Sequence, residues 1–119
     1  MGLEQLKIYQ VAEKLELELH EVTKSFPKDE LYRSVDQIRR SSAAVANNLA
    51  EGYSRASNLE KIRYCHIAKG EAEETKRNVE RSSKKGFLPV SQADQITNQY
   101  TELLKMISGY IKYLKEKAA

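Results

Sequence analysis

The pattern of hydrophobic and polar positions predicts four amphipathic helices. In four segments the hydrophobic residues recur at alternating steps of three and four, which places them on one side of an α-helix. These segments cover roughly residues 3–25, 28–51, 58–85 and 91–117. Short connections between such helices favour an all-α fold, an antiparallel up-down-up-down four-helix bundle that forms one domain over residues 1–119.

The expected breaks contain residues that end or begin helices. Pro27 pushes the residue before it out of the helical conformation. Gly52 and Gly86 are predicted to be left-handed caps, because glycine adopts that conformation without steric cost. Ser57 and Glu60 fit a capping box that begins the third helix.

Small residues mark the middle of the third helix. Gly70 costs about 1 kcal/mol relative to alanine in a helix interior, so the sequence predicts a packing reason for it. We therefore expect a neighbouring helix to approach closely near residues 68–72.

The second helix carries two seams. The first is a core stripe through Leu31, Val35, Ile38, Ser42, Val45 and Leu49. The second seam is small and polar and runs through Glu30, Arg33, Gln37, Arg40, Ser41, Ala44, Asn48 and Glu51. Because most of these side chains need no burial within one subunit, the second seam is predicted to be an oligomer interface. Its interface residues are Gln37, Ser41, Ala44, Asn48 and Glu51.

Composition indicates a helical, cytoplasmic protein. The chain has only 5 Gly, 2 Pro and no Trp, so turn-forming residues are scarce. Its hydrophobic runs fall short of the ~20 residues of a membrane span, and no secretory signal opens the sequence. A single cysteine, Cys65, excludes an intrachain disulfide and is expected to be a small buried hydrophobe. The net charge of +3 permits nucleic-acid binding without requiring it.

Motifs for catalysis, metal binding or a cofactor are missing, so none of these is predicted. A carboxylate-bridged metal site in a bundle needs Glu three residues before His, but Leu17 and Arg63 occupy those positions before His20 and His66. The glutamates at positions 71, 73 and 74 are better explained by a solvated helix face than by acid–base chemistry. An enzyme remains a minor alternative, with a site shared between subunits and built from Arg39, Arg40 and Glu51.

The arginines of the second helix are the first candidates for phosphate contact. Adjacent helical residues diverge by about 100°, so Arg39 and Arg40 cannot both reach the same point. Arg40 is expected to pair with Asp36 or with a glutamate of a neighbouring subunit. Arg39 and Arg55 are then the stronger candidates, because a guanidinium can bind phosphate with two hydrogen bonds. The full set of predicted nucleic-acid-binding residues is Arg39, Arg55, Arg40, Lys84 and Lys85.

One stretch resembles a known family. The sequence QIRRSSAAVANNLAEGYSR at residues 37–55, preceded by Phe26-Pro27, is similar to the signature of the four-helix proteins encoded by intervening sequences in bacterial 23S rRNA genes. Ile67, Ala68, Gly70 and Glu74 resemble the next family element, although Glu71 stands where that pattern has serine. The resemblance implies a cytoplasmic bundle that assembles into rings, most simply pentamers, and relatives that bind nucleic acid.

Two functions from different classes follow as expectations. The leading hypothesis is a non-catalytic, homo-oligomeric protein that binds RNA or DNA, with several modest basic patches acting together. The alternative is a structural scaffold that binds another protein along the second seam of helix two, without nucleic acid. A membrane partner is not expected.

Overall fold

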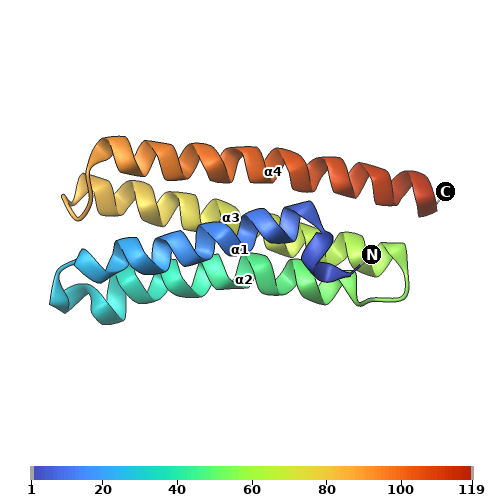
Figure 1. Cartoon of the computed structure of the whole chain (residues 1–119), viewed down its shortest axis with the longest axis horizontal. Helices are drawn as coiled ribbons and strands as arrows, with labels where there is room; N and C mark the ends of the chain where they lie inside the picture. Colours follow the sequence, from blue (N-terminus) through green and yellow to red (C-terminus); the bar gives the residue numbers. More distant parts are fainter. Residues whose placement is uncertain (1, 119) are drawn as a thin grey trace.

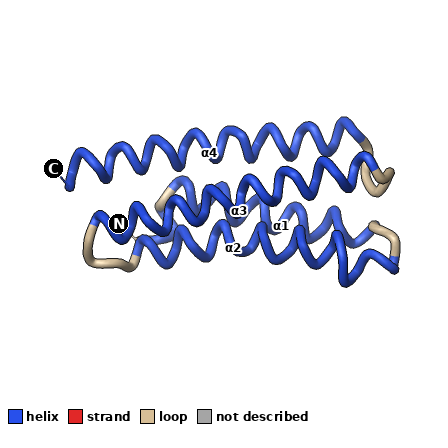
Figure 2. The backbone as a smooth tube through the Cα atoms, turned by 180° about the vertical axis from the view of Figure 1, so that it is seen from behind, coloured by secondary structure: helices blue, strands red, loops and turns tan. Residues whose placement is uncertain are grey.

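The computed structural model describes residues 2–118, which form an all-α, antiparallel four-helix bundle (Figure 1). Its helices are α1 (Lys7–Val22), α2 (Asp36–Tyr53), α3 (Asn58–Lys84) and α4 (Val90–Ala118). The bundle measures 48 × 22 × 21 Å, and its connections lie at its two ends (Figure 2). None of the helices within residues 2–118 is long and apolar enough to span a membrane. The predicted fold class and the three predicted breaks are confirmed.

Short helical turns flank the first two helices. A 3₁₀ turn, η1 (Leu3–Gln5), precedes α1, and a second, η2 (Thr23–Ser25), follows it. Beyond Pro27 come a third 3₁₀ turn, η3 (Lys28–Glu30), and a π-helical turn, η4 (Leu31–Val35). The predicted first helix is therefore an α-helix with a 3₁₀ turn at each end. The predicted second helix is an α-helix preceded by a 3₁₀ turn and a π-helical turn.

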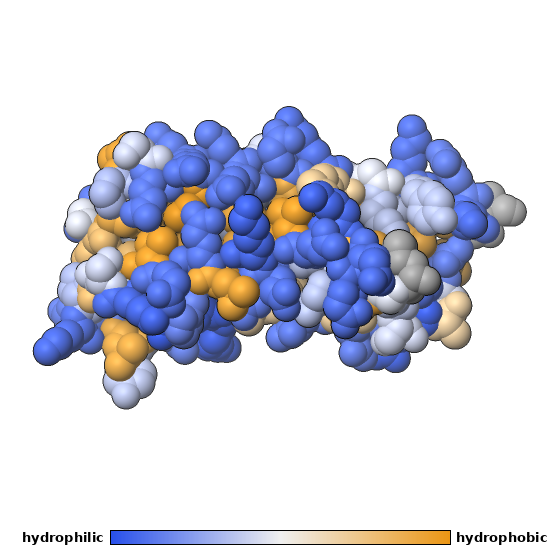
Figure 3. Space-filling model, in the orientation of Figure 1, coloured by the Kyte–Doolittle hydropathy of each residue, from blue (hydrophilic) through white to orange (hydrophobic). Residues whose placement is uncertain are grey.

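The predicted core stripe of the second helix is confirmed from Val35 onward. Its members are buried in the core together with residues of the other three helices, and Tyr100, Leu103 and Ile107 of α4 are fully buried. Leu31 was wrongly assigned to this stripe, because its side chain is 46% exposed. The cause is η4, in which Arg33 has φ −125° and ψ −105° and interrupts the helical register. The visible surface is mostly hydrophilic, with separate hydrophobic patches (Figure 3).

Helices α2 and α3 pack closely through small residues. Ser41 of α2 and Thr75 of α3 are both buried, and their hydroxyl oxygens are hydrogen-bonded at 2.7 Å. Near the end of α2, a Cβ added to Gly52 would lie 2.8 Å from the Cβ of Tyr64 on α3. The predicted left-handed cap at Gly52 is therefore wrong, since this residue lies inside α2 and its missing side chain makes room for Tyr64.

The other predicted caps have mixed outcomes. Gly86 is confirmed as a left-handed residue with φ +84°, just after the end of α3. Ser57 begins α3, where its hydroxyl accepts a hydrogen bond from the backbone N–H of Glu60 at 3.1 Å. The packing reason expected for Gly70 is wrong, because a Cβ at this exposed position would meet no atom within 4 Å.

Gly52 and Gly70 provide a matched pair of stability tests. Gly52→Ala should lower the free energy of unfolding by about 1–3 kcal/mol, because the new methyl group overlaps Tyr64 across the α2–α3 contact. Gly70→Ala should raise it by about 0.5–1 kcal/mol, because alanine has the higher helix propensity and the site is open. Urea unfolding of both variants measures the two values. Equal effects of the same sign would contradict the close packing of α2 and α3.

Candidate nucleic-acid interface

Arg39 joins α2 to the end of α1. Its Nε donates to Thr23 Oγ1 at 3.0 Å, and one terminal nitrogen donates to the backbone carbonyl of His20 at 3.3 Å. The last carbonyls of a helix lack partners within the helix, so a guanidinium is well placed there. Arg39 is half-buried, and only its remaining donors could meet a phosphate. Its phosphate role stays a prediction, but its contact with α1 is structural.

Arg40 points away from Arg39, as the helical geometry requires. It forms the expected ion pair with Asp36, at 3.4 Å between Nη1 and Oδ2. The Arg40 side chain is 79% exposed, so this pair within one helix contributes little to stability, about 0.5 kcal/mol at most.

Arg55 anchors the connection between α2 and α3. It pairs with Glu51, donates a hydrogen bond to the Tyr64 hydroxyl at 2.9 Å, and its guanidinium carbon lies 4.9 Å from the centre of the Tyr64 ring. Arg63 approaches the same ring at 5.2 Å. Arg55 therefore contacts Glu51 within one chain. The sequence had assigned Arg55 to nucleic-acid binding and Glu51 to the oligomer interface.

Lys84 and Lys85 lie exposed at the carboxyl end of α3. Positive charge is favourable there because the backbone carbonyls at the end of a helix carry partial negative charge. Lys84 lines a small hollow together with Glu80 and Asp94, so acidic side chains surround it. This position offers phosphate a weaker electrostatic attraction than a purely basic one.

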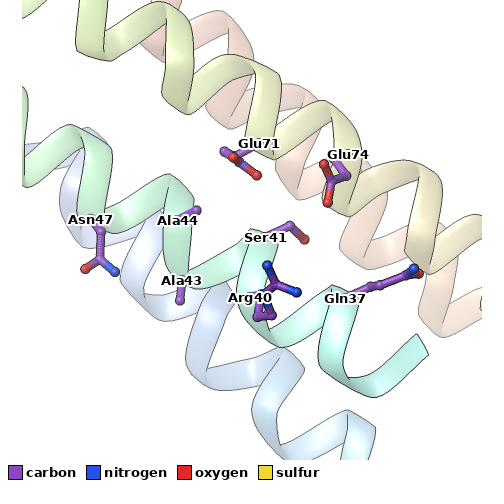
Figure 4. A pocket seen from close by; sticks show the side chains of 8 residues that line it. All are labelled: Gln37, Arg40, Ser41, Ala43, Ala44, Asn47, Glu71 and Glu74. Carbon is purple, nitrogen blue, oxygen red and sulfur yellow. The ribbon is translucent and has the colours of Figure 1, made fainter. Parts of the chain in front are cut away.

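The middle of the second seam forms one wall of a polar groove of about 620 Å³ between α2 and α3 (Figure 4). The predicted interface residues Asn48 and Glu51 are not among the residues that line it. Its lining residues are Gln37, Arg40, Ser41, Ala43, Ala44 and Asn47 of α2 with Glu71 and Glu74 of α3. The premise that this seam needs no burial within one subunit is wrong for two members. Ser41 is buried beneath Thr75, and Glu30 is buried and accepts a hydrogen bond from the Ser34 hydroxyl. Gln37 and Glu51 are exposed, while Ala44 and Asn48 are half-buried.

The charges of this groove do not suit nucleic acid. Burial raises the pKa of Glu71, the negative charge of Glu74 raises it further, and Arg40 opposes both effects. Neither glutamate forms an ion pair within the described chain. Two carboxylates against one guanidinium repel phosphate, so this groove suits a protein surface better than an RNA or DNA backbone.

A basic groove runs between α3 and α4. Two adjoining hollows of about 430 and 280 Å³ share Lys69 of α3 and Ser108 of α4. We call the combined surface the lysine groove. Its basic residues are His66, Lys69 and Lys76 of α3 with Lys105, Lys112 and Lys115 of α4, and its other lining residues are Glu73, Thr101, Leu104, Ser108 and Ile111. Among the lining residues, five lysines face a single carboxylate, and Lys105 also forms an exposed ion pair with Glu102 at 3.5 Å. The remaining excess of positive charge is the pattern that attracts a polyanion.

The sequence held a signal for the lysine groove. Lys69 and Lys76 are seven residues apart, as are Lys105 and Lys112, and a seven-residue step returns to nearly the same face of a helix. The predicted set of arginines and helix-end lysines did not include these residues.

Helix α3 thus presents opposite charges on its two flanks. Glu71 and Glu74 face the groove with α2, whereas Lys69 and Lys76 face the groove with α4. The modest net charge of +3 hides this separation.

Residues 4–109 match the family described as 23S rRNA-intervening sequence protein. The chain belongs to this family. The fold is similar to the crystal structure of a protein of unknown function from the S23 ribosomal protein family of Bacteroides thetaiotaomicron VPI-5482, with a TM-score of 0.79 and 21% sequence identity. That similarity covers 88% of this chain and 98% of the other. No curated protein matches the chain significantly.

Within this family fold, the structure explains part of the signature stretch at residues 37–55. Arg39 holds α1, Gly52 admits Tyr64, and Arg55 joins the two sides of the α2–α3 connection. Glu71, which differs from the serine of the family pattern, lines the polar groove opposite Ser41. These residues stabilise the bundle, so a matching signature is not by itself a sign of a ligand site.

The structure also shows the surroundings of the groups considered for reactive chemistry. Cys65 is buried as expected, and burial raises the pKa of its thiol to about 11, so the thiolate is scarce at neutral pH. Within the described part of the chain, no group of three or more His, Cys, Asp or Glu side chains could hold a metal ion. Within one chain, Arg40 and Glu51 are eleven residues apart, about 16 Å along the helix, so a single chain does not bring these two residues of the alternative enzyme site together.

Arg39 and Arg40 give a direct test of these assignments. Arg39→Gln should lower the free energy of unfolding by about 1–3 kcal/mol, because it removes charge-assisted hydrogen bonds to Thr23 and His20. Arg40→Gln is the matched control and should change stability by less than about 0.5 kcal/mol, because its ion pair is exposed. Thermal and urea unfolding measure both, and equal stabilities would contradict the structural role of Arg39.

Proposed function

We propose that this protein binds nucleic acid, most simply RNA, as a non-catalytic homo-oligomer. The observation that supports binding is the lysine groove, where five lysines from two helices face one carboxylate. Lysines that neutralise phosphates release condensed counterions, which makes binding favourable at low salt. The family description refers to an intervening sequence of 23S rRNA, and this makes RNA the first ligand to test.

The groove explains how a weakly basic chain can act on a polyanion. A net charge of +3 spread evenly would attract nucleic acid only weakly, but clustered lysines create a local positive potential. A ring of identical chains would repeat the lysine groove, and several weak sites on one strand bind far more tightly than one.

The contact between copies is proposed to use the polar groove between α2 and α3. A complementary polar surface can pack on the alanines of this groove. It can also form hydrogen bonds with the amides of Gln37 and Asn47 and with the two glutamates, which have no ion pair. A pentamer is the ring implied by the family resemblance.

Mass measurement at micromolar concentration tests the proposed contact between copies, and a monomeric mass would contradict it. Ala44→Glu, or Asn47→Glu at a more exposed position, should dissociate the ring by adding charge to the groove.

The alternative is a protein scaffold without nucleic acid. The observation in its favour is the same polar groove, whose glutamates would suit a basic protein segment. A scaffold of this kind would leave the lysine groove without a function, and its partner binding would not depend on Lys69 or Lys112.

Removal of groove lysines tests the proposed function. The triple variant Lys69→Gln, Lys112→Gln and Lys115→Gln should bind a labelled RNA at least about tenfold more weakly at low salt. The slope of log affinity against log salt should fall by about one for each lost phosphate contact. Fluorescence anisotropy at several salt concentrations gives both quantities.

The matched control removes positive charge from exposed positions of α1, with Lys7→Gln and Lys14→Gln. This control should retain most of the affinity, because these lysines lie outside the groove. An equal loss of affinity per charge in the two variants would assign binding to net charge alone. A parent protein that binds no RNA even at low salt would leave the scaffold as the better explanation.

A further inference from the structure

We infer that the lysine groove holds the phosphodiester backbone of a single strand, RNA or DNA, and does not read the bases. This inference rests on the proposed function and names the form of nucleic acid that the site accepts. It follows from the length and straightness of the groove, from the placement of its lysines on both walls, and from the kinds of side chain that line it.

Lysines line both walls of the groove at matching intervals. On α3 the Lys69–Lys76 step spans seven residues, and so does the Lys105–Lys112 step on α4, each about 10.5 Å along its helix axis. Packed helices lie about 8–10 Å apart, within reach of lysine side chains from both sides. A phosphate chain between the two helices would therefore meet ammonium groups on both sides at each step.

The groove is straight. From Thr101 to Lys115 its α4 wall covers fourteen residue steps, about 21 Å. A flexible single strand can follow such a groove along its whole length, as strands do in positively charged channels. The backbone of a duplex winds around its own axis, so it leaves a straight groove after a few phosphates. The number of phosphate contacts thus favours the single strand.

The lining offers no platform for bases. No aromatic ring occurs among the residues that line the groove, whereas proteins that hold unpaired bases stack them on aromatic side chains. Of its two hydroxyl groups, that of Thr101 already donates to the carbonyl of Thr97 at 3.0 Å. Contacts to phosphate therefore dominate, and neither base identity nor the ribose hydroxyl should matter much.

Glu73 provides the sharpest discriminating residue. It is the carboxylate of the groove and lies between Lys69 and Lys76 on α3. A phosphate backbone in the groove must pass this negative charge, so its removal should strengthen binding. A contact with a charge-balanced protein surface would predict no such gain.

The experiment compares four probes of equal length in competition with a labelled uridine oligomer of about 20 nucleotides. The competitors are oligouridylate, oligoadenylate, oligothymidylate and a 20-base-pair DNA duplex. The three single strands should compete within about threefold of one another, and the duplex should be at least about tenfold weaker. Glu73→Gln should tighten single-strand binding about fivefold at low salt, the effect of about one nearby charge in water. Glu13→Gln, an exposed glutamate on α1, is the matched control and should change little.

The outcomes separate this inference from the proposed function. A duplex that competes as well as the single strands would overturn the inference while nucleic-acid binding stands. So would a tenfold preference among the single strands, or an unchanged affinity in Glu73→Gln. Failure of every probe to bind the parent protein would overturn both.

Discussion

The close contact between α2 and α3 determines how the charged side chains of this protein are arranged. Ser41 and Thr75 share a buried hydrogen bond, and Gly52 lets the Tyr64 Cβ and the Lys61 backbone approach α2. Because protein interiors are tightly packed, these contacts fix the rotation of α3 about its own axis. With that rotation fixed, Glu71 lies toward α2 and Lys69 lies toward α4. A turn of α3 by one residue would mix the two sets of charges.

This arrangement reconciles the two functional expectations. In the proposed function, the acidic side of α3 would meet another copy or another protein, and its basic side would contact phosphate. The arginines of the signature stretch largely support the bundle, since Arg39 holds α1 and Arg55 holds the α2–α3 connection. The charge of Arg55 is balanced by Glu51, whereas among the five groove lysines only Lys105 forms an ion pair within the described chain, with Glu102.

Much of the fold could be predicted from the sequence, because apolar periodicity, Pro27 and Ser57 act locally. The exceptions depend on contacts between helices. Gly52 has the residue type of a cap, but its actual role requires knowledge that Tyr64 packs there. The exposure of Leu31 depends on a π-helical turn that no local sequence pattern predicts. The candidate lysine groove could not be predicted, because a groove lined by two helices can be recognised only when their relative rotation is known.

The most direct test of the account is lysine footprinting with a single-stranded RNA. Acetylation of the protein, with and without saturating oligouridylate, would be followed at each lysine by mass spectrometry. The account predicts that RNA slows acetylation of the groove lysines, most strongly at Lys69 and Lys112. Lys7 and Lys14 on α1 should be acetylated as fast as in the free protein. Protection centred on Lys84 and Lys85, or equal protection of all lysines, would contradict it.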